Sequence, residues 1–383
     1  MTSHRPIYLD HHATTPLDKR VLDAMLPYFT EQFGNPSSGN HLYGWEAEAA
    51  VKTARETLAE SIGADPVEIV FTSGATEANN LAIKGVAEAY FTKGRHLITV
   101  VTEHSAVLDP YRYLEKLGFE VTFLPVQSDG LVDLNYLKQA LRPDTILVSV
   151  MAANNEIGVL QPLAEIGELC HGHGVLFHTD AAQAFGKIPL NVQPLKIDLM
   201  SFTAHKLYGP KGIGALYIRR RDPRVKLAAQ LHGGGQERGI RAGTLYTPQI
   251  IGFAKAAELA LSEQMAEAER LTQLRTQLWE NLSVLDGIYL NGHPTQRLAG
   301  NLNISVDRVD GSALLLGLQP TIAVSSGAAC SSTRIEPSHV LRALGHSDAL
   351  ARASIRFGMG RFNMVDEIGQ AAATTVQTIQ SLR

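Results

Sequence analysis

Short apolar runs that alternate with helical patterns between residues 50 and 220 constrain this chain more than any other feature. Strands that are separated by helices pair mostly in parallel, because the helix carries the chain back to the edge where the previous strand began. The pattern therefore predicts an α/β fold built around a mostly parallel sheet. The predicted strands are EIVFT at 68–72, HLITVV at 96–101, TILVSV at 145–150, VLFHT at 175–179 and DLMSF at 198–202.

The rest of the chain predicts a second, smaller unit. GALYIRR at 214–220 follows DLMSF too closely for a helix to fit between them, so we expect it to pair antiparallel. An Ala/Leu/Glu-rich stretch over 248–283 predicts one long helix, which the strand candidates NLNISV, TIAVS and ASIRF and a final amphipathic helix follow. Because 383 residues exceed one small core, we predict a large domain over 13–257 and a small α+β domain formed by 1–12 with 258–383.

Charge, hydropathy and cysteine content exclude several classes of protein. The formal net charge of −4 disfavours a general nucleic-acid binder, which would usually be basic. No apolar run approaches the ~18–20 residues that cross a bilayer, and the N-terminus shows neither a signal-peptide nor a transit-peptide pattern. We therefore expect a cytoplasmic protein that binds neither nucleic acid directly nor a membrane. Its two cysteines, Cys170 and Cys330, form neither a disulfide framework nor a zinc set.

Polar residues follow each predicted strand at the point where the strand ends. In open α/β sheets, ligands bind outside the carboxyl ends of the strands, so these residues predict one shared site. The residues concerned are Ser73–Thr76, Thr102–His104, Asn154–Glu156, Asp180 with Gln183, and Thr203–Lys206.

The segment Ser73-Gly74-Ala75-Thr76 lies between the first strand and a helix that we expect to begin near Glu77. Its small residues let backbone N–H groups approach an anion, and a helix N-terminus favours negative charge. The same residues would also serve as an ordinary helix N-cap. A nucleotide site is disfavoured, because the G-x-G-x-x-G pattern is absent here and no Ser or Thr follows a Gly-Lys pair in Gly209-Pro210-Lys211-Gly212.

Asp180 and Lys206 are candidates for cofactor chemistry. Asp180 ends an apolar strand, and a buried carboxylate is costly unless a cation or hydrogen-bond donors meet it. The protonated ring nitrogen of pyridoxal phosphate would be such a cation, although a helix N-cap role explains the residue equally well. Lys206 follows a strand, where a desolvated amine is suited to forming a Schiff base. The alternative for Lys206 is an ordinary surface lysine.

The two cysteines differ in their surroundings. Cys330 lies among small and polar residues, which predicts an exposed and reactive thiol. Cys170 lies on a predicted helix end beside apolar residues, and we interpret it as structural. His171 and His173 have no further ligands at metal-binding spacing, and the adjacent His11 and His12 point apart if the chain is extended, so we expect no metal site.

Taken together, the motifs resemble the NifS/IscS-type cysteine desulfurases, which are class V aminotransferase-like, fold-type I pyridoxal-phosphate enzymes. The resemblance runs from residue 7 to the end, with the order and spacing of the motifs intact. It implies a large domain with a mostly parallel seven-stranded sheet and a smaller C-terminal α+β domain. The motifs are Tyr8–Asp10, Ala13–Pro16, Phe71–Asn80, Asn155–Gly158, His205-Lys206 and Ser325–Cys330.

The resemblance also implies a role for each matching residue. Lys206 holds the cofactor pyridoxal 5'-phosphate as a Schiff base and Asp180 pairs with its ring nitrogen. His104 stacks on the ring, in a position to move protons, and Gln183 contacts the phenolic oxygen. The further cofactor-binding residues are Ala75, Thr76, Thr203 and His205 at the phosphate, Asn155, and Thr244 from the second subunit of a homodimer.

For the reaction, the resemblance implies that L-cysteine is the substrate. Asn155 and Arg356 bind its carboxylate, for which a bidentate arginine is suited. Lys206 removes the α-proton, and Cys330 takes the sulfur as a persulfide while L-alanine leaves. The acceptors would be proteins such as an iron–sulfur scaffold. The sequence Ser325–Cys330 is typical of the branch in which the cysteine loop is long enough to swing outward to an acceptor.

The chain departs from the family pattern at a few positions, and other functions remain open. His11-His12 replaces the more usual Asn-Ala or Tyr-Ser, Thr203-Ala204 replaces Ser-Gly, and Ala328 replaces a common Ser. A C–S lyase or a class V aminotransferase on the same scaffold would not need the thiol of Cys330. A non-catalytic binding protein would not need Lys206, Asp180, His104 and Cys330 together. A nucleotide-binding protein is disfavoured because this chain lacks the glycine fingerprints.

Overall fold

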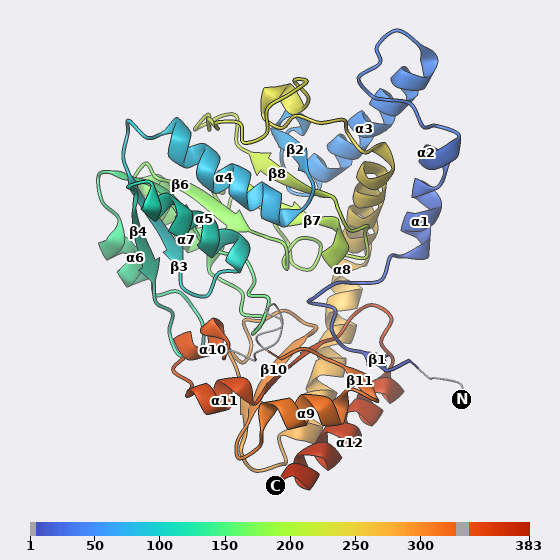
Figure 1. The fold of residues 1–383 in the computed structure, drawn as a ribbon, viewed down its shortest axis with the longest axis vertical. Helices are drawn as coiled ribbons and strands as arrows, with labels where there is room; N and C mark the ends of the chain where they lie inside the picture. The colour runs from blue at the N-terminus through green and yellow to red at the C-terminus, as the bar shows by residue number, and fades with distance from the viewer. Residues whose placement is uncertain (1–4, 327–336) are drawn as a thin grey trace.

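The computed structural model describes residues 5–326 and 337–383, and a seven-stranded sheet is its central element (Figure 1). The strands lie in the order β2-β8-β7-β6-β5-β3-β4. Their bounds are β2 (Ile69–Thr72), β3 (His96–Val100), β4 (Glu120–Leu124), β5 (Thr145–Ser149), β6 (Leu176–Asp180), β7 (Leu199–Thr203) and β8 (Gly214–Ile218).

The direction of the strands confirms the predicted α/β architecture. Every neighbouring pair from β7 to β4 is parallel. Strand β8 runs antiparallel to both β2 and β7, as expected for a strand that no helix separates from β7. Strand β4 was not predicted from the sequence, because it lies at the edge of the sheet, is only partly buried and lacks a continuous apolar run.

Both faces of this sheet are covered by helices. Adjacent residues of a strand point to opposite faces, and Val70 and Phe71 of β2 accordingly belong to two different hydrophobic clusters. The cluster around Val70 packs against α4 (Ala75–Ala89) and α5 (Ser105–Lys116). The cluster around Phe71 packs against α3 (Leu42–Glu60), α7 (Leu163–Gly172) and the first half of α8.

A second unit has its own hydrophobic core. In it, β10 (Asn301–Val306) pairs antiparallel with β9 (Ile288–Leu290) and with β12 (Ser354–Gly358). The N-terminal strand β1 (Ile7–Tyr8) joins this unit by pairing in parallel with β11 (Ile322–Ala323). Its helices are α9 (Gly311–Leu318), α10 (His339–Ala343), α11 (Asp348–Arg352) and α12 (Val365–Leu382).

Helix α8 (Thr247–Leu282) runs through both units (Figure 1). Phe253 in its first half packs in the core of the large sheet, whereas Leu274 and Leu278 in its second half pack in the core of the smaller unit. The predicted long helix is thus confirmed, while the domain division at 13–257 and at 1–12 with 258–383 stays a prediction. The other helices are α1 (Lys19–Met25), α2 (Pro27–Thr30) and α6 (Leu134–Ala140). Within the described ranges, no helix combines the length and the apolar character that a membrane span requires.

Candidate active site

A pocket of about 850 Å³ lies at the carboxyl ends of the parallel strands and is closed on one side by residues of the smaller unit. The predicted convergence of the strand ends is therefore found in the structure. One of the predicted site residues, Thr244, does not line the pocket of this chain. Thr244 is exposed elsewhere on the surface, and Cys330 lies outside the described residues. The predicted residues that line it are Ala75, Thr76, His104, Asn155, Asp180, Gln183, Thr203, His205, Lys206 and Arg356.

A glycine turn and a helix N-terminus form the end of the pocket next to β2. Helix α4 begins at Ala75, two residues before the expected start. Gly74 adopts φ +153°, which favours glycine, and a Cβ there would meet only Thr203 Oγ1, at 3.9 Å. A Cβ on Gly214 would lie 2.7 Å from Gly74 Cα, so the turn packs directly on β8. The first amides of α4 lack intrahelical acceptors and suit an anion.

Thr203 and His205 border the same end. The Thr203 hydroxyl is buried and donates to the Ile213 carbonyl at 3.0 Å, so its proton is already used within the chain. The His205 ring nitrogen Nδ1 lies 3.2 Å from Thr14 Oγ1. Burial, with the nearby positive charge of Lys206, lowers the pKa of His205 to about 4, so its ring is neutral at physiological pH. His205 therefore keeps a ring nitrogen that can donate to an anion, whereas the Thr203 hydroxyl would have to turn away from Ile213 to do so.

Asp180 ends β6 and presents a buried carboxyl to the pocket. Its oxygens accept hydrogen bonds from Asn79 Nδ2 at 2.7 Å and from the Ala182 amide at 2.8 Å. Both alternatives for Asp180 therefore have support: it caps the following turn and still faces the pocket. Beside it, burial and the charge of Asp180 raise the pKa of the Glu103 carboxyl well above its usual value. The raised pKa favours the protonated form of Glu103, and its Oε2 has no hydrogen-bond partner among the described residues.

Lys206 follows β7 in a short 3-10 turn, η2 (Ala204–Lys206). Its Nζ donates to the backbone carbonyls of His12 and Ala13 at 2.5 and 2.6 Å. Gln183 Nε2 donates to the same His12 carbonyl at 2.8 Å, and Gln183 Oε1 lies 3.1 Å from His12 Nδ1. The pair His11-His12 departs from the family pattern, and the His12 carbonyl thus holds both Lys206 and Gln183.

His104 is the N-cap of α5, and its Nδ1 accepts a hydrogen bond from the Ala106 amide at 3.0 Å. An acceptor nitrogen carries no proton, so in the neutral ring the proton lies on Nε2. Because His104 lines the pocket, this arrangement leaves Nε2 as the ring nitrogen that can exchange a proton with a ligand.

Arg356 of β12 lies opposite the strand ends and is 5% exposed. Its guanidinium forms an ion pair with Asp10 at 2.8 Å and donates to the Asn155 carbonyl at 2.9 Å. Its Nε has no acceptor among the described residues. A buried N–H without an acceptor is costly, so a bound carboxylate would stabilise this group.

The two described segments next to residues 327–336 are each held by a carboxyl group. On one side Ser325 Oγ donates to Asp10 Oδ2 at 2.9 Å. On the other side Ser338 Oγ donates to Glu156 Oε2 at 2.5 Å. Burial raises the pKa of Glu156 to about 7. Both carboxyls belong to segments that also contact Arg356.

The position of Cys170 bears on one further prediction. Cys170 is fully buried on α7, and burial raises the pKa of its thiol, which confirms that it packs in the core. Within residues 5–326 and 337–383, no three His, Cys, Asp or Glu side chains gather in a way that could hold a metal ion.

Several residues that support the site were given no role from the sequence. Asn79 lies on the buried face of α4, and a polar residue on an otherwise apolar helix face was a usable signal. The contacts of Asp10, His12 and Ser338 join segments that are far apart in the chain, and no local pattern marks them.

Comparison with known proteins places these features in a family. The sequence model of the Aminotransferase class-V family matches residues 7–370. A cysteine desulfurase IscS from Methylococcus capsulatus is 55% identical, over 99% of this chain and 93% of its own length. A solved NifS-like protein is 38% identical with a TM-score of 0.91, over 98% of this chain and 100% of that one. A structure of SspA in complex with cysteine is 38% identical with a TM-score of 0.83, over 94% of this chain and 100% of that one.

Proposed function

The chain belongs to the class-V aminotransferase family and is a cysteine desulfurase, and we propose that it passes the sulfur of L-cysteine through Cys330 while releasing L-alanine. The observation that carries the proposal is that Lys206, Asp180, His104 and Arg356 line a single pocket. This set supplies an amine, a buried carboxyl, an imidazole and a guanidinium, one for each task that the reaction needs. The family's enzymes use pyridoxal 5'-phosphate.

The residues of the pocket fit this cofactor. A turn that favours glycine at Gly74 leaves room at the start of α4, where a phosphate is favoured. Asp180 is buried and faces the pocket without an ion pair to any described residue, so a cationic ring nitrogen would complete it. When bound, the cofactor supplies an electron sink that lets the substrate's α-proton leave. The residues that would hold it are Ala75, Thr76, Thr203, His205, His104, Asn155, Asp180, Gln183 and Lys206, with Thr244 of a second subunit.

Lys206 and His104 would move the protons. The carbonyls of His12 and Ala13 fix the position of Lys206 Nζ, and a fixed amine within reach of the α-carbon can remove its proton. His104 holds its Nδ1 on the Ala106 amide, so it would exchange protons through Nε2.

Arg356 and Asn155 would hold the substrate's carboxylate. Asp10 and the Asn155 carbonyl fix the guanidinium plane of Arg356, which lines the pocket, and its Nε–H lacks an acceptor among the described residues. Restricting the substrate in this way brings its α-proton and its sulfur to defined positions.

Cys330 would act as a thiolate on the substrate's sulfur. A bond forms between Cys330 Sγ and the substrate sulfur, the substrate's C–S bond breaks, and its electron pair stays with the carbon, which takes up a proton. The products are L-alanine and a persulfide on Cys330, so atoms and electrons balance without an outside oxidant. The persulfide sulfur would then pass to an acceptor protein, such as an iron–sulfur scaffold.

We also propose that the protein is a homodimer. Helices α1 to α3 and the segments between them expose large apolar side chains, including Leu26, Phe29 and Trp45. The ring of exposed Tyr246 lies 6.2 Å from that of Phe29, so the segment that carries Thr244 adjoins this apolar surface. A second copy that covers this surface would bury the apolar side chains and could bring Thr244 to its partner's pocket.

The test is to incubate the cofactor-loaded protein with L-cysteine and a reductant, and to quantify alanine and sulfide. Cys330→Ala is the test variant, and Cys170→Ala is the matched control because Cys170 is a buried core residue. We expect equal amounts of alanine and sulfide from the wild type and from Cys170→Ala. Cys330→Ala should retain the absorbance of bound cofactor and lose turnover.

Other outcomes would point to other reactions. Sulfide release by Cys330→Ala at the wild-type rate would exclude Cys330 as the sulfur carrier. Pyruvate as the carbon product would indicate a C–S lyase, and transfer of the amino group to a keto acid would indicate an aminotransferase.

A further inference from the structure

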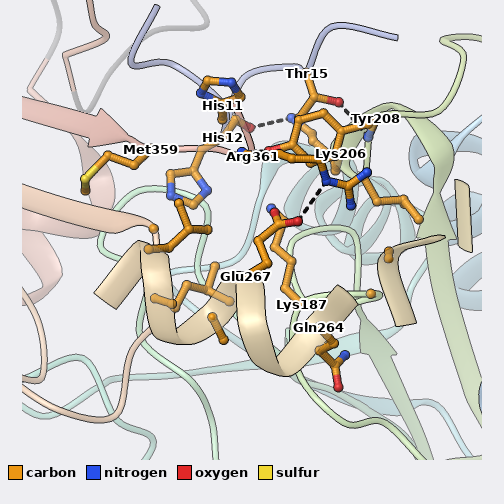
Figure 2. Close-up of a pocket in the computed structure, with 18 residues that line it drawn as sticks. His11, His12, Thr15, Lys187, Lys206, Tyr208, Gln264, Glu267, Met359 and Arg361 are labelled. Atoms are coloured by element: carbon orange, nitrogen blue, oxygen red, sulfur yellow. Dashed lines mark hydrogen bonds and ion pairs between the residues drawn. The ribbon is translucent and has the colours of Figure 1, made fainter. Parts of the chain in front are cut away.

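A second, smaller cavity adjoins the active-site pocket and shares His12 and Lys206 with it (Figure 2). Its volume of about 50 Å³ can hold a few water molecules but neither a cofactor nor an amino acid. Lys187, from the turn after β6, also lines this cavity, as do Glu267 and Arg361. The reaction proposed above uses Lys206 and gives no role to Lys187, although the two amines line one cavity.

One amide and one carbonyl connect the two amines. Lys187 Nζ donates to Gln183 Oε1 at 3.2 Å, and Nε2 of the same amide donates to the His12 carbonyl at 2.8 Å. Lys206 Nζ donates to that carbonyl as well, at 2.5 Å. Because an ammonium group can only donate, Lys187 fixes the oxygen of Gln183 on its own side and the nitrogen on the side of Lys206.

The charges around Lys187 disfavour its protonated form. Burial lowers the pKa of Lys187 to about 7, and the positive charge of Lys206 is the next largest cause. Arg356 adds to this lowering. Glu267 opposes it, but that carboxylate already forms an ion pair of 2.8 Å with Arg361.

The remaining titratable groups that face Lys187 stay neutral near physiological pH. Burial lowers the pKa of His11 to about 4 and that of His12 well below its usual value. Burial also raises the pKa of the Tyr208 hydroxyl, which lines the same cavity. Lys187 is therefore the group of this cavity whose pKa lies near neutral pH, and Lys206 is the cation that acts on it.

We propose that Lys187 is a positioning residue for Lys206: the two amines disfavour a charge on both sides of the small cavity at once, so a proton held by Lys187 keeps Lys206 in the unprotonated form that the reaction needs. The interaction between two charges is reciprocal, so the repulsion that acts on Lys187 acts equally on Lys206. A neighbouring cation is one of the ways in which proteins activate a lysine amine. The inference rests on the proposed function, because it takes Lys206 to be the amine that holds the cofactor.

The test is a pH titration of the visible absorbance of the cofactor-loaded protein, which reports protonation at the point where the cofactor is attached. Lys187→Gln keeps a donor to Gln183 but carries no charge, and Lys187→Arg keeps both. We expect the midpoint of the absorbance titration to lie about one pH unit higher in Lys187→Gln than in the wild type. This shift corresponds to a tenfold change in the protonation equilibrium. Lys187→Arg should titrate at or below the wild-type midpoint, because a guanidinium stays charged.

Two results would overturn the inference. One is an absorbance titration of Lys187→Gln whose midpoint equals that of the wild type. The other is a rise in Lys187→Arg as large as that in Lys187→Gln, which would assign the effect to packing. By contrast, a wild type without cofactor absorbance, or an absorbance that survives Lys206→Ala, would contradict the proposed function itself.

A second measurement needs no substitution at Lys187. The cofactor-free wild type and Lys206→Ala are labelled with acetic anhydride across a pH series, and modification of Lys187 is quantified by mass spectrometry. If the two amines repel each other, Lys187 gains its proton more readily without Lys206, and its labelling curve moves to higher pH. Identical labelling curves in the two proteins would contradict the repulsion.

Discussion

The two halves of the active-site pocket are assembled from the chain in different ways. Ala75, Asp180 and Lys206 form one half, and each lies at or just after the carboxyl end of a strand in a single sheet. Arg356 lines the other half and is held by Asp10, and the 2.8 Å ion pair between them joins positions 346 residues apart. We call these the strand-end half and the ion-pair half.

The difference teaches which forces hold each half. In the strand-end half, the backbone ladder of the sheet places each residue, so removing one side chain leaves its neighbours where they are. In the ion-pair half, buried side chains place one another. Removing one partner leaves the other charge buried without compensation, so activity and stability should fall together.

The largest effect is expected in the strand-end half, from Lys206→Ala. Loss of the amine that would hold the cofactor and move the α-proton should lower turnover by roughly 10³-fold or more. The free energy of unfolding should stay close to that of the wild type, as thermal unfolding of the cofactor-free proteins would show. Lys211→Ala is the matched control, because Lys211 also lines the pocket but is exposed. A similar loss of turnover in Lys211→Ala would contradict the assignment of Lys206 as the lysine that the reaction requires.

The ion-pair half should respond differently to Arg356→Gln. We expect KM for L-cysteine to rise by about 100-fold, the equivalent of about 2.7 kcal/mol, because the carboxylate loses its charged donor. The free energy of unfolding should also fall by about 3 kcal/mol, because Asp10 loses its partner.

Arg342→Gln is the control for that variant. Arg342 lines the same pocket, but its 2.7 Å ion pair with Asp348 is half exposed, so we expect a change in stability of at most about 1 kcal/mol. The measurements are steady-state kinetics and urea unfolding. A fall in stability without a change in KM would mean that Arg356 is structural only, and the two halves would then differ less than we infer.

Asn79→Ala sharpens the comparison within the strand-end half. It removes the 2.7 Å hydrogen bond to Asp180, while the Ala182 amide still holds the other oxygen. We expect kcat to fall by about tenfold, with a smaller change in KM, because the carboxyl remains in place but is less fixed. A loss as large as that of Lys206→Ala would show that a side-chain contact, and not the sheet, places Asp180.

The smallest effect concerns the pH dependence of stability at Glu156, which lies next to the Asn155 carbonyl that holds Arg356. The pKa of Glu156 is raised to about 7, whereas a glutamate in the unfolded chain titrates near 4.3. Between these values the folded state binds the proton more tightly, so stability falls as the pH rises, by up to about 1.4 kcal/mol per pH unit.

Glu156→Gln should remove this contribution and still accept the hydrogen bond from Ser338. Urea unfolding of both proteins from about pH 5 to about pH 8 would measure the difference in slope. Parallel curves would show that Glu156 does not titrate in this range.

The sequence by itself determined the sheet and the strand-end half. Side chains of a strand alternate between two faces, and residues buried on both faces give short apolar runs, from which β2, β3, β5, β6 and β7 were predicted. The carboxyl ends of parallel strands share one edge, so the pattern alone brings Asp180 and Lys206 together. Strand β4 was missed because the edge of a sheet buries only part of a strand.

Only the tertiary structure decided the ion-pair half and the surroundings of Lys206. Asp10 meets Arg356 because β1 pairs with β11 and the next residues lie along β12, and no local spacing encodes these pairings. The His12 carbonyl that holds Lys206 and Gln183 is a backbone group, which every residue carries, so its role leaves no trace in the residue type. Periodic burial is a local property that a sequence displays, whereas contacts between distant segments exist only once the chain has folded.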